Sequence, residues 1–126
     1  MNIPAELRYS SDHEWVRVDG ATATIGITEY AQDALGDVVF VEMPDAGLAV
    51  AAGESFSEVE STKSVSDIYA PITGSIPEVN AELESQPELL NSDPYGAGWI
   101  CRIEISDPSE LDGLMDAEAY RALTEG

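Results

Sequence analysis

Residues 54–74 read ESFSEVESTKSVSDIYAPITG, a pattern that predicts two short β-strands joined by a tight turn. Side chains alternate between the two faces of a strand, which places Phe56 and Glu60 on the same face of the first arm. The turn at Thr62 and Lys63 lacks the Asn-Gly or Asp-Gly pair that is usual in two-residue hairpins. We therefore expect a hairpin whose tip holds Lys63 in solvent, where an enzyme can modify it and a modified arm can swing.

Lys63 is the only lysine in a chain of 126 residues that carries 25 acidic residues and a formal net charge of −20. Lysine normally ranks among the commonest residues. The other basic residues are Arg8, Arg17, Arg102 and Arg121. A single cation in an acidic patch also arises from local charge balance. Composition and hairpin placement alone thus leave a functional Lys63 and a merely solvated Lys63 equally open.

Charge and composition exclude several classes of protein. A net charge of −20 argues against binding to nucleic acid or anionic membranes, because both need clustered lysine and arginine. An apolar content of 44% indicates a globular chain, and its length corresponds to one domain. No stretch approaches the roughly 20 apolar residues of a membrane span. The first ten residues, MNIPAELRYS, resemble neither a secretory signal nor a transit peptide, so we expect a cytoplasmic protein.

The single cysteine and the single histidine do not indicate a metal site or a catalytic centre. Cys101 alternates with Arg102 in the run WICRIEIS and shares the apolar face with Ile103, so we expect a buried structural thiol. His13 has no second histidine or nearby cysteine and is interpreted as a packing or hydrogen-bonding residue at the start of a strand. No convincing nucleophile–base pair is present, so we do not expect an enzyme.

Most of the chain before residue 107 reads as short strands separated by turn residues. A helix over residues 29–35 is predicted between the capping residue Thr28 and Gly36. The stretch 82–90 is helical or irregular, and 92–96 is a loop. Strands are predicted at residues 15–18, 21–27, 38–43, 56–61, 64–69, 75–80 and 99–106. Short strands at this spacing are typical of a sandwich or a barrel.

The last twenty residues change in character. Asp107 is a capping residue followed by Pro108 at the first helical position, and residues 116–123 predict a second short helix. We interpret residues 1–126 as one domain, with a β-rich body over 1–106 and a helical tail over 107–126 that lies on one side.

The spacing of Glu60, Lys63 and Gly74 resembles a lipoyl-attachment motif. Glu60 lies three residues before Lys63, and Gly74 lies eleven residues after it. In lipoyl carriers these two positions are recognition features for the attaching enzyme. Biotin carriers place methionine on both sides of the lysine, whereas Thr62 and Ser64 stand here. The resemblance therefore favours lipoate over biotin.

The resemblance extends over residues 9–123. The segments SDHEWVRVDGATATIGITEYAQDALGDVVFVEMPDAG, DIYAPITGSI, LLNSDPYGAGWI and DPSELDGLMDAEAY are similar to the H proteins of the glycine cleavage system. The HEW, GITEYAQ and DPYGAGW blocks and the helical tail are not expected in the shorter lipoyl domains of 2-oxoacid dehydrogenases. The resemblance implies a mainly β, lipoyl-domain-like barrel-sandwich hybrid with short helices and a C-terminal helical extension.

The resemblance also implies a cofactor and partners. Lipoate would be joined to Lys63 by an amide, after the action of a lipoate-attaching enzyme. A PLP-dependent glycine decarboxylase would load an aminomethyl group on this arm, and a tetrahydrofolate-dependent aminomethyltransferase would take the one-carbon unit. Dihydrolipoamide dehydrogenase would then restore the disulfide. The chain itself would be a non-catalytic carrier, because the thiol–disulfide chemistry belongs to the cofactor.

H proteins fold the loaded arm against a surface cleft. The positions that match this cleft are Glu14 and Asp67, with Asp12 beside them, although Asp12 departs from the small hydroxyl residue of the family. Carboxylates suit the ammonium group of an aminomethyl guest, and a desolvated carboxylate binds it more strongly. The alternative is that each of the three is an ordinary solvated surface acid.

Two other functions remain compatible with the sequence. The chain could relay lipoyl or octanoyl groups to other acceptors, or it could be an unmodified acidic binding module that uses one face of the sandwich.

The acidity and the near absence of lysine favour a salt-rich cytoplasm, where salt screens the self-repulsion of the chain. A family tendency to acidity is the alternative. In either case we expect partners with basic surfaces.

Overall fold

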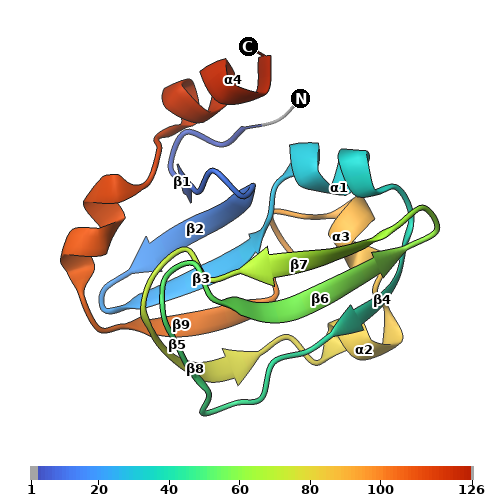
Figure 1. Ribbon diagram of the computed structural model, residues 1–126, viewed down its shortest axis with the longest axis horizontal. Helices are drawn as coiled ribbons and strands as arrows, with labels where there is room; N and C mark the ends of the chain where they lie inside the picture. Colours follow the sequence, from blue (N-terminus) through green and yellow to red (C-terminus); the bar gives the residue numbers. More distant parts are fainter. Residues whose placement is uncertain (1–2, 126) are drawn as a thin grey trace.

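The computed structural model describes residues 3–125, which form two antiparallel β-sheets with short helices at their edges (Figure 1). One sheet has the strand order β1-β2-β3-β9-β8-β5, and the other has the order β4-β6-β7. The strands are β1 Arg8–Tyr9, β2 Glu14–Asp19, β3 Thr22–Ile27, β4 Val38–Glu42, β5 Ala49–Val50, β6 Ser55–Ser61, β7 Val65–Tyr69, β8 Gly74–Val79 and β9 Cys101–Ile105. The predicted mainly β architecture is confirmed.

The helices are short and lie outside the two sheets. They are α1 Glu29–Leu35, α2 Glu82–Ser85, α3 Leu89–Ser92, the 3-10 helix η1 Pro108–Gly113, and α4 Ala117–Glu125. As predicted, the Thr28 side chain caps α1 by accepting a hydrogen bond from the Ala31 N–H at 3.2 Å, and α1 ends at Gly36. The Asp107 side chain caps η1 by accepting a hydrogen bond from the Ser109 N–H, also as expected.

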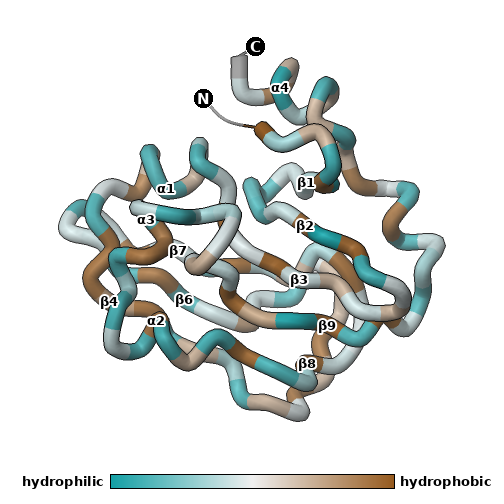
Figure 2. The backbone as a smooth tube through the Cα atoms, turned by 180° about the vertical axis from the view of Figure 1, so that it is seen from behind, coloured by the Kyte–Doolittle hydropathy of each residue, from teal (hydrophilic) through white to brown (hydrophobic). Residues whose placement is uncertain are grey.

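The main core lies between the two sheets. Fully buried side chains from both sheets, such as Ile25 and Ile103 on one and Val59 on the other, form a single apolar cluster. Figure 2 shows hydrophobic and hydrophilic residues alternating along β9, which is the pattern of a strand with one buried face. Cys101 belongs to this cluster, and burial raises its pKa to about 12, so the prediction of a buried structural thiol is confirmed.

A second cluster attaches the C-terminal helix. Tyr120 of α4 is fully buried and stacks on Tyr9 of β1, with ring centroids 4.7 Å apart. Ile3, Leu7 and Trp15 complete this cluster. Figure 1 shows α4 beside β1 and the N-terminal segment. The predicted tail therefore has a buried anchor of its own.

The structure differs from the predicted elements in a few places. The strands β1 and β5 have two residues each, which is too short for an alternating pattern, and they were not predicted. The stretch 82–90 divides between α2 and α3, and α3 extends to Ser92, into the predicted loop. The prediction that Phe56 and Glu60 share a face is wrong. A register shift between Ser55 and Ser57 buries Phe56, whereas Glu60 is exposed.

None of the helices of residues 3–125 is long and apolar enough to cross a bilayer.

Candidate functional site

The turn between β6 and β7 presents Lys63 to solvent, as predicted. The Ser61 N–H donates to the Ser64 carbonyl at 2.8 Å and closes the turn. The Ser61 hydroxyl oxygen also accepts hydrogen bonds from the backbone N–H groups of Lys63 and Ser64, at 3.2 and 3.1 Å. This side chain supplies the local hydrogen bonds that stabilise the turn, which explains why neither Asn nor Gly is needed at its tip.

The Lys63 stem lies over the C-terminal end of α1. A Cβ atom added to Gly36 would lie 3.3 Å from Cε and 3.4 Å from Cδ of Lys63. The Thr62 N–H donates to the Asp37 carbonyl at 3.0 Å, which ties the turn to the corner between α1 and β4. The turn is therefore supported by a neighbouring element, while the Lys63 amine makes no ion pair with any residue of the range 3–125.

A cavity of about 170 Å³ lies between α1 and β7. Tyr30 and Ala34 of α1 form one wall, and Asp67 of β7 belongs to the opposite wall, with Asp12 and His13 from the loop before β2 also lining the space. Two of the three predicted cleft residues, Asp12 and Asp67, thus border the same cavity, and both are exposed. The apolar part of this lining comes largely from α1, the helix on which the Lys63 stem lies.

Glu14, the third predicted cleft residue, is in a different place. Its side chain is only 1% exposed and does not line the cavity. The Ser10 hydroxyl donates to its carboxylate at 2.7 Å, and the Tyr69 backbone N–H also bonds to the carboxylate. Burial raises the pKa of Glu14 to about 7, against the effect of these two hydrogen bonds. Glu14 is therefore a buried acid that changes charge near neutrality.

Glu60 lies in an exposed row across the three-stranded sheet. It is paired with Phe40 of β4 and with Val65 of β7. Phe40 is 52% exposed and Val65 is 55% exposed. These two apolar side chains next to the Lys63 turn were not predicted, because the pairing of β4 with β6 has no local signal in the sequence.

A second row on this sheet contains only acids. Glu42, Glu58 and Asp67 are paired directly across β4, β6 and β7, and none of them makes an ion pair within residues 3–125. Like charges that lie directly opposite each other destabilise a sheet. The outer face of β4-β6-β7 is therefore an acidic surface with two exposed apolar side chains near Lys63.

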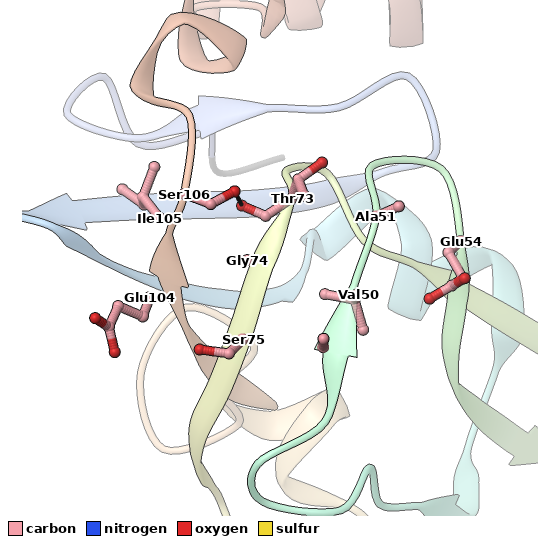
Figure 3. A pocket seen from close by; sticks show the side chains of 10 residues that line it. Val50, Ala51, Glu54, Thr73, Gly74, Ser75, Glu104, Ile105 and Ser106 are labelled. Carbon is pink, nitrogen blue, oxygen red and sulfur yellow. Dashed lines mark hydrogen bonds between the residues drawn. The ribbon is translucent and has the colours of Figure 1, made fainter.

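Gly74 lies outside the Lys63 hairpin, in β8 of the other sheet. Figure 3 shows it between the strands of Val50 and Ile105, with which it pairs. A Cβ atom at Gly74 would lie only 2.0 Å from the Glu104 carbonyl oxygen and 2.7 Å from Cγ2 of Ile103. A glycine is thus required here by the close approach of β8 to β9. The hollow that Gly74 lines, of about 560 Å³, belongs to the β5-β8-β9 edge of the other sheet.

His13 is a hydrogen-bonding residue at the start of a strand, as predicted. Its Nδ1 atom is 2.8 Å from the Tyr120 hydroxyl oxygen, and its ring lies 4.7 Å from that of Tyr30. Burial lowers the pKa of His13 against the attraction of Asp12. Tyr120 was not expected to contact this region, because it lies 107 residues away in the sequence.

Comparison with known proteins identifies one family. The model of the family described as glycine cleavage H-protein matches residues 7–126. The glycine cleavage system H protein of Symbiobacterium thermophilum is 56% identical over 124 residues, which cover 98% of this chain and 97% of that protein. The corresponding protein of Beutenbergia cavernae is 57% identical over 126 residues, covering 100% of this chain and 99% of that protein.

A solved structure supports the fold. The crystal structure of a glycine cleavage system H protein from Mycobacterium marinum superposes with a TM-score of 0.89 at 42% sequence identity, covering 98% of this chain and 100% of that chain. The predicted lipoyl-domain-like barrel-sandwich hybrid is thereby confirmed.

Proposed function

Because this chain belongs to the glycine cleavage H-protein family, we propose that it is the lipoyl-carrying shuttle of the glycine cleavage system, with lipoate joined by an amide to Lys63. Such a protein is a carrier and has no catalytic turnover of its own. When attached, the lipoyl group supplies a disulfide for thiol–disulfide exchange and a flexible arm that transports the aminomethyl group of glycine.

One observation carries the assignment to Lys63. The only lysine of the chain lies at the tip of an exposed turn, and its amine has no ion-pair partner among residues 3–125. An amine in this position is available for amide formation, whereas the guanidinium of an arginine would not form that amide. The hydrogen bonds of Ser61 and Asp37 hold the turn firmly, as an anchor that must be presented to several enzymes requires.

The cavity beside α1 suits the cationic end of a loaded arm. Asp67 and Asp12 are exposed acids at the border of a space that is otherwise lined largely by apolar side chains. Two carboxylates at the border of an apolar space attract an ammonium group that enters it. Glu14, although buried, adds negative charge to this region when it is ionised. We propose that these three acids shelter the aminomethyl group from water.

Loss of the aminomethyl group from loaded protein tests this role. Asp67→Asn and Glu14→Gln should each release the group faster than the unsubstituted protein, while Asp19→Asn, at an exposed position of β2, should not. If release is unchanged in Asp67→Asn and in Glu14→Gln, the proposed shelter is wrong.

For the attaching enzyme, we propose that Glu60 makes a direct contact, because it is exposed close to Lys63. Gly74 acts indirectly, since it allows β8 to approach β9 in the other sheet.

The acidic outer face of β4-β6-β7 suits enzymes with basic surfaces. The proposed partners are the lipoate-attaching enzyme, the PLP-dependent glycine decarboxylase, the aminomethyltransferase and dihydrolipoamide dehydrogenase, in a salt-rich cytoplasm. No role for nucleic acid or membranes is proposed for a chain of net charge −20.

Intact mass spectrometry tests the attachment site. After expression in a host that attaches lipoate, the chain should gain one lipoyl mass, and the Lys63→Arg variant should gain none. Absence of the added mass, or its persistence in Lys63→Arg, would contradict the proposal. Reconstitution with the decarboxylase and the aminomethyltransferase then separates a shuttle from a lipoyl relay, because a relay would lose the attached group from Lys63.

A further inference from the structure

Tyr120 is the centre of a buried polar cluster that joins three parts of the fold. Its hydroxyl oxygen is 2.7 Å from the Thr28 hydroxyl and 2.8 Å from Nδ1 of His13. Its ring is fully buried and stacks on Tyr9 with an interplanar angle of 11°. The C-terminal helix α4 thus contacts the cap of α1 and the loop before β2 through a single hydroxyl group.

The direction of each hydrogen bond follows from the number of donors. Thr28 is fully buried, and its hydroxyl oxygen already accepts a hydrogen bond from the Ala31 N–H. The hydroxyl hydrogen of Thr28 also needs an acceptor, and Tyr120 is the other polar partner that the structure places next to it. Thr28 therefore donates to Tyr120, which leaves the single hydrogen of Tyr120 for Nδ1 of His13.

The opposite direction is unfavourable. If Nδ1 of His13 carried a hydrogen, it would donate to the Tyr120 hydroxyl oxygen. Either Tyr120 would then donate to Thr28, or Thr28 would donate to Tyr120. In each case one of the two buried hydroxyl hydrogens would lack an acceptor among these contacts. The cluster consequently favours a neutral His13 that accepts at Nδ1 and carries its hydrogen on Nε2.

The cluster also supports the walls of the cavity. His13 lines the cavity, and its ring lies against Tyr30, another lining residue. The Thr28 N–H donates to the His13 carbonyl at 3.1 Å, so the loop before β2 and the start of α1 are connected directly. His13 has a φ of +70°, a backbone conformation that non-glycine residues adopt rarely. The contact with Tyr120 helps to hold it there.

We propose that Tyr120 is a positioning residue, which fixes His13 in its neutral Nε2-protonated form and holds the start of α1 against it, so that the C-terminal helix completes the cavity. The functional part of this inference rests on the proposed function. An imidazolium at His13 would add a positive charge beside Asp12 and Asp67, in the space proposed to receive an ammonium group. A neutral His13 leaves both carboxylates available to that group.

Several ionisable groups lie near His13 and affect its titration. They are Asp12 on its own loop, Tyr30 on α1, Asp67 on β7 and Tyr120 on α4. Burial lowers the pKa of His13, which agrees with a ring that is kept neutral.

Nuclear magnetic resonance of the ¹⁵N-labelled full chain tests the proposal, because His13 is the only histidine and its ring signals need no assignment. Long-range ¹H–¹⁵N correlation should show Nδ1 as an unprotonated acceptor and Nε2 as the protonated nitrogen. In Tyr120→Phe, which keeps the stacking on Tyr9, both neutral forms should appear, and the His13 titration midpoint should rise by about 0.5–1 pH unit.

Tyr9→Phe is the matched control, because it removes the hydroxyl of the other ring of the stack, which donates to the Pro4 carbonyl at 2.5 Å. Its His13 spectrum should match that of the unsubstituted chain. A protonated Nδ1 in the unsubstituted chain would overturn the proposal even if Tyr120→Phe failed to fold. An unchanged His13 spectrum in folded Tyr120→Phe would also overturn it.

A second measurement addresses the cavity. Loaded Tyr120→Phe should lose its aminomethyl group several-fold faster than loaded Tyr9→Phe. Equal rates, together with the expected His13 spectra, would contradict the functional part alone. Failure of lipoate to attach at Lys63 would contradict the proposed function and leave the hydrogen-bond assignment intact.

Discussion

The stem of Lys63 rests on Gly36, where an added Cβ atom would lie 3.3 Å from Cε of the lysine. Gly36 has φ +84° and ψ −160°, a conformation that is almost restricted to glycine. The residue that ends α1 therefore also leaves room for the anchor of the proposed arm.

Gly36→Ala should affect both stability and lipoate attachment. Backbone strain should lower the free energy of unfolding by about 1–3 kcal/mol, and the new methyl group should displace the Lys63 stem and slow attachment. Gly20→Ala is the matched control, because Gly20 has a φ of +64° but no atom within 4 Å of the added Cβ. Denaturant unfolding and the rate of lipoyl mass gain should show a stability loss in both variants and slower attachment in Gly36→Ala alone. Equal attachment rates would exclude a role for the Gly36–Lys63 contact.

Phe40→Ser should weaken recognition by the attaching enzyme without unfolding the protein. Phe40 is 52% exposed in the same row as Glu60, so its loss should lower the free energy of unfolding by about 1 kcal/mol, which leaves the chain folded. A contact at the centre of an interface is worth more than about 1 kcal/mol, which predicts a fall in kcat/KM for attachment of about fivefold or more. Val18→Ser, at a 39% exposed apolar residue of the other sheet, should leave kcat/KM unchanged. A similar small effect of both substitutions would argue against this face as the contact surface.

Features that depend on neighbouring residues were predictable from the sequence. The capping oxygen of Thr28 and the glycine after Leu35 define α1 within a few residues, and the buried face of Cys101 follows from alternation. The burial of Phe56 was not predictable in this way, because a register shift interrupts the alternation.

The site itself depends on contacts between distant segments. Asp12 and Asp67 share a cavity only because β7 lies opposite α1 and the loop before β2. Tyr120 meets Thr28 across 92 residues, and nothing in the sequence around either residue indicates the other. The burial of Glu14 has a weak local signal, since alternation along β2 places it on the same face as Val16.

Gly74→Ala should separate direct from indirect recognition. The added Cβ atom would lie 2.0 Å from the Glu104 carbonyl oxygen, so β8 and β9 would have to move apart. We expect a loss of about 2 kcal/mol or more in the free energy of unfolding. When a stabilising osmolyte restores the folded fraction, attachment to Lys63 should recover. Persistent failure of attachment in fully folded Gly74→Ala would indicate a direct contact with the enzyme.

Glu14 should make the protein less stable as the pH rises through neutrality. Burial raises its pKa from 4.5 to about 7, so between these values the folded state binds more protons than the unfolded state. The stabilising protonation is fully present below pH 4.5 and is lost as the pH rises towards and beyond 7. Glu14→Gln keeps the shape and stays neutral, and it should be more stable than the unsubstituted chain at pH 8 by up to about 3 kcal/mol. Urea unfolding from pH 5 to 8 should show this difference grow with pH, and parallel profiles would contradict the raised pKa.

Salt should stabilise the folded chain. A net charge of −20 favours unfolding through self-repulsion, and the row of Glu42, Glu58 and Asp67 adds repulsion within one sheet. Raising KCl from about 0.05 M to above 1 M shortens the Debye length from over 10 Å to about 3 Å, so Tm should rise by several degrees. Sorbitol matched in osmolality controls for solute exclusion, which also stabilises folded proteins. In Glu58→Gln, which removes the middle charge of the row, the salt-dependent rise should be smaller. Equal Tm at low and multimolar KCl would contradict adaptation to a salt-rich cytoplasm.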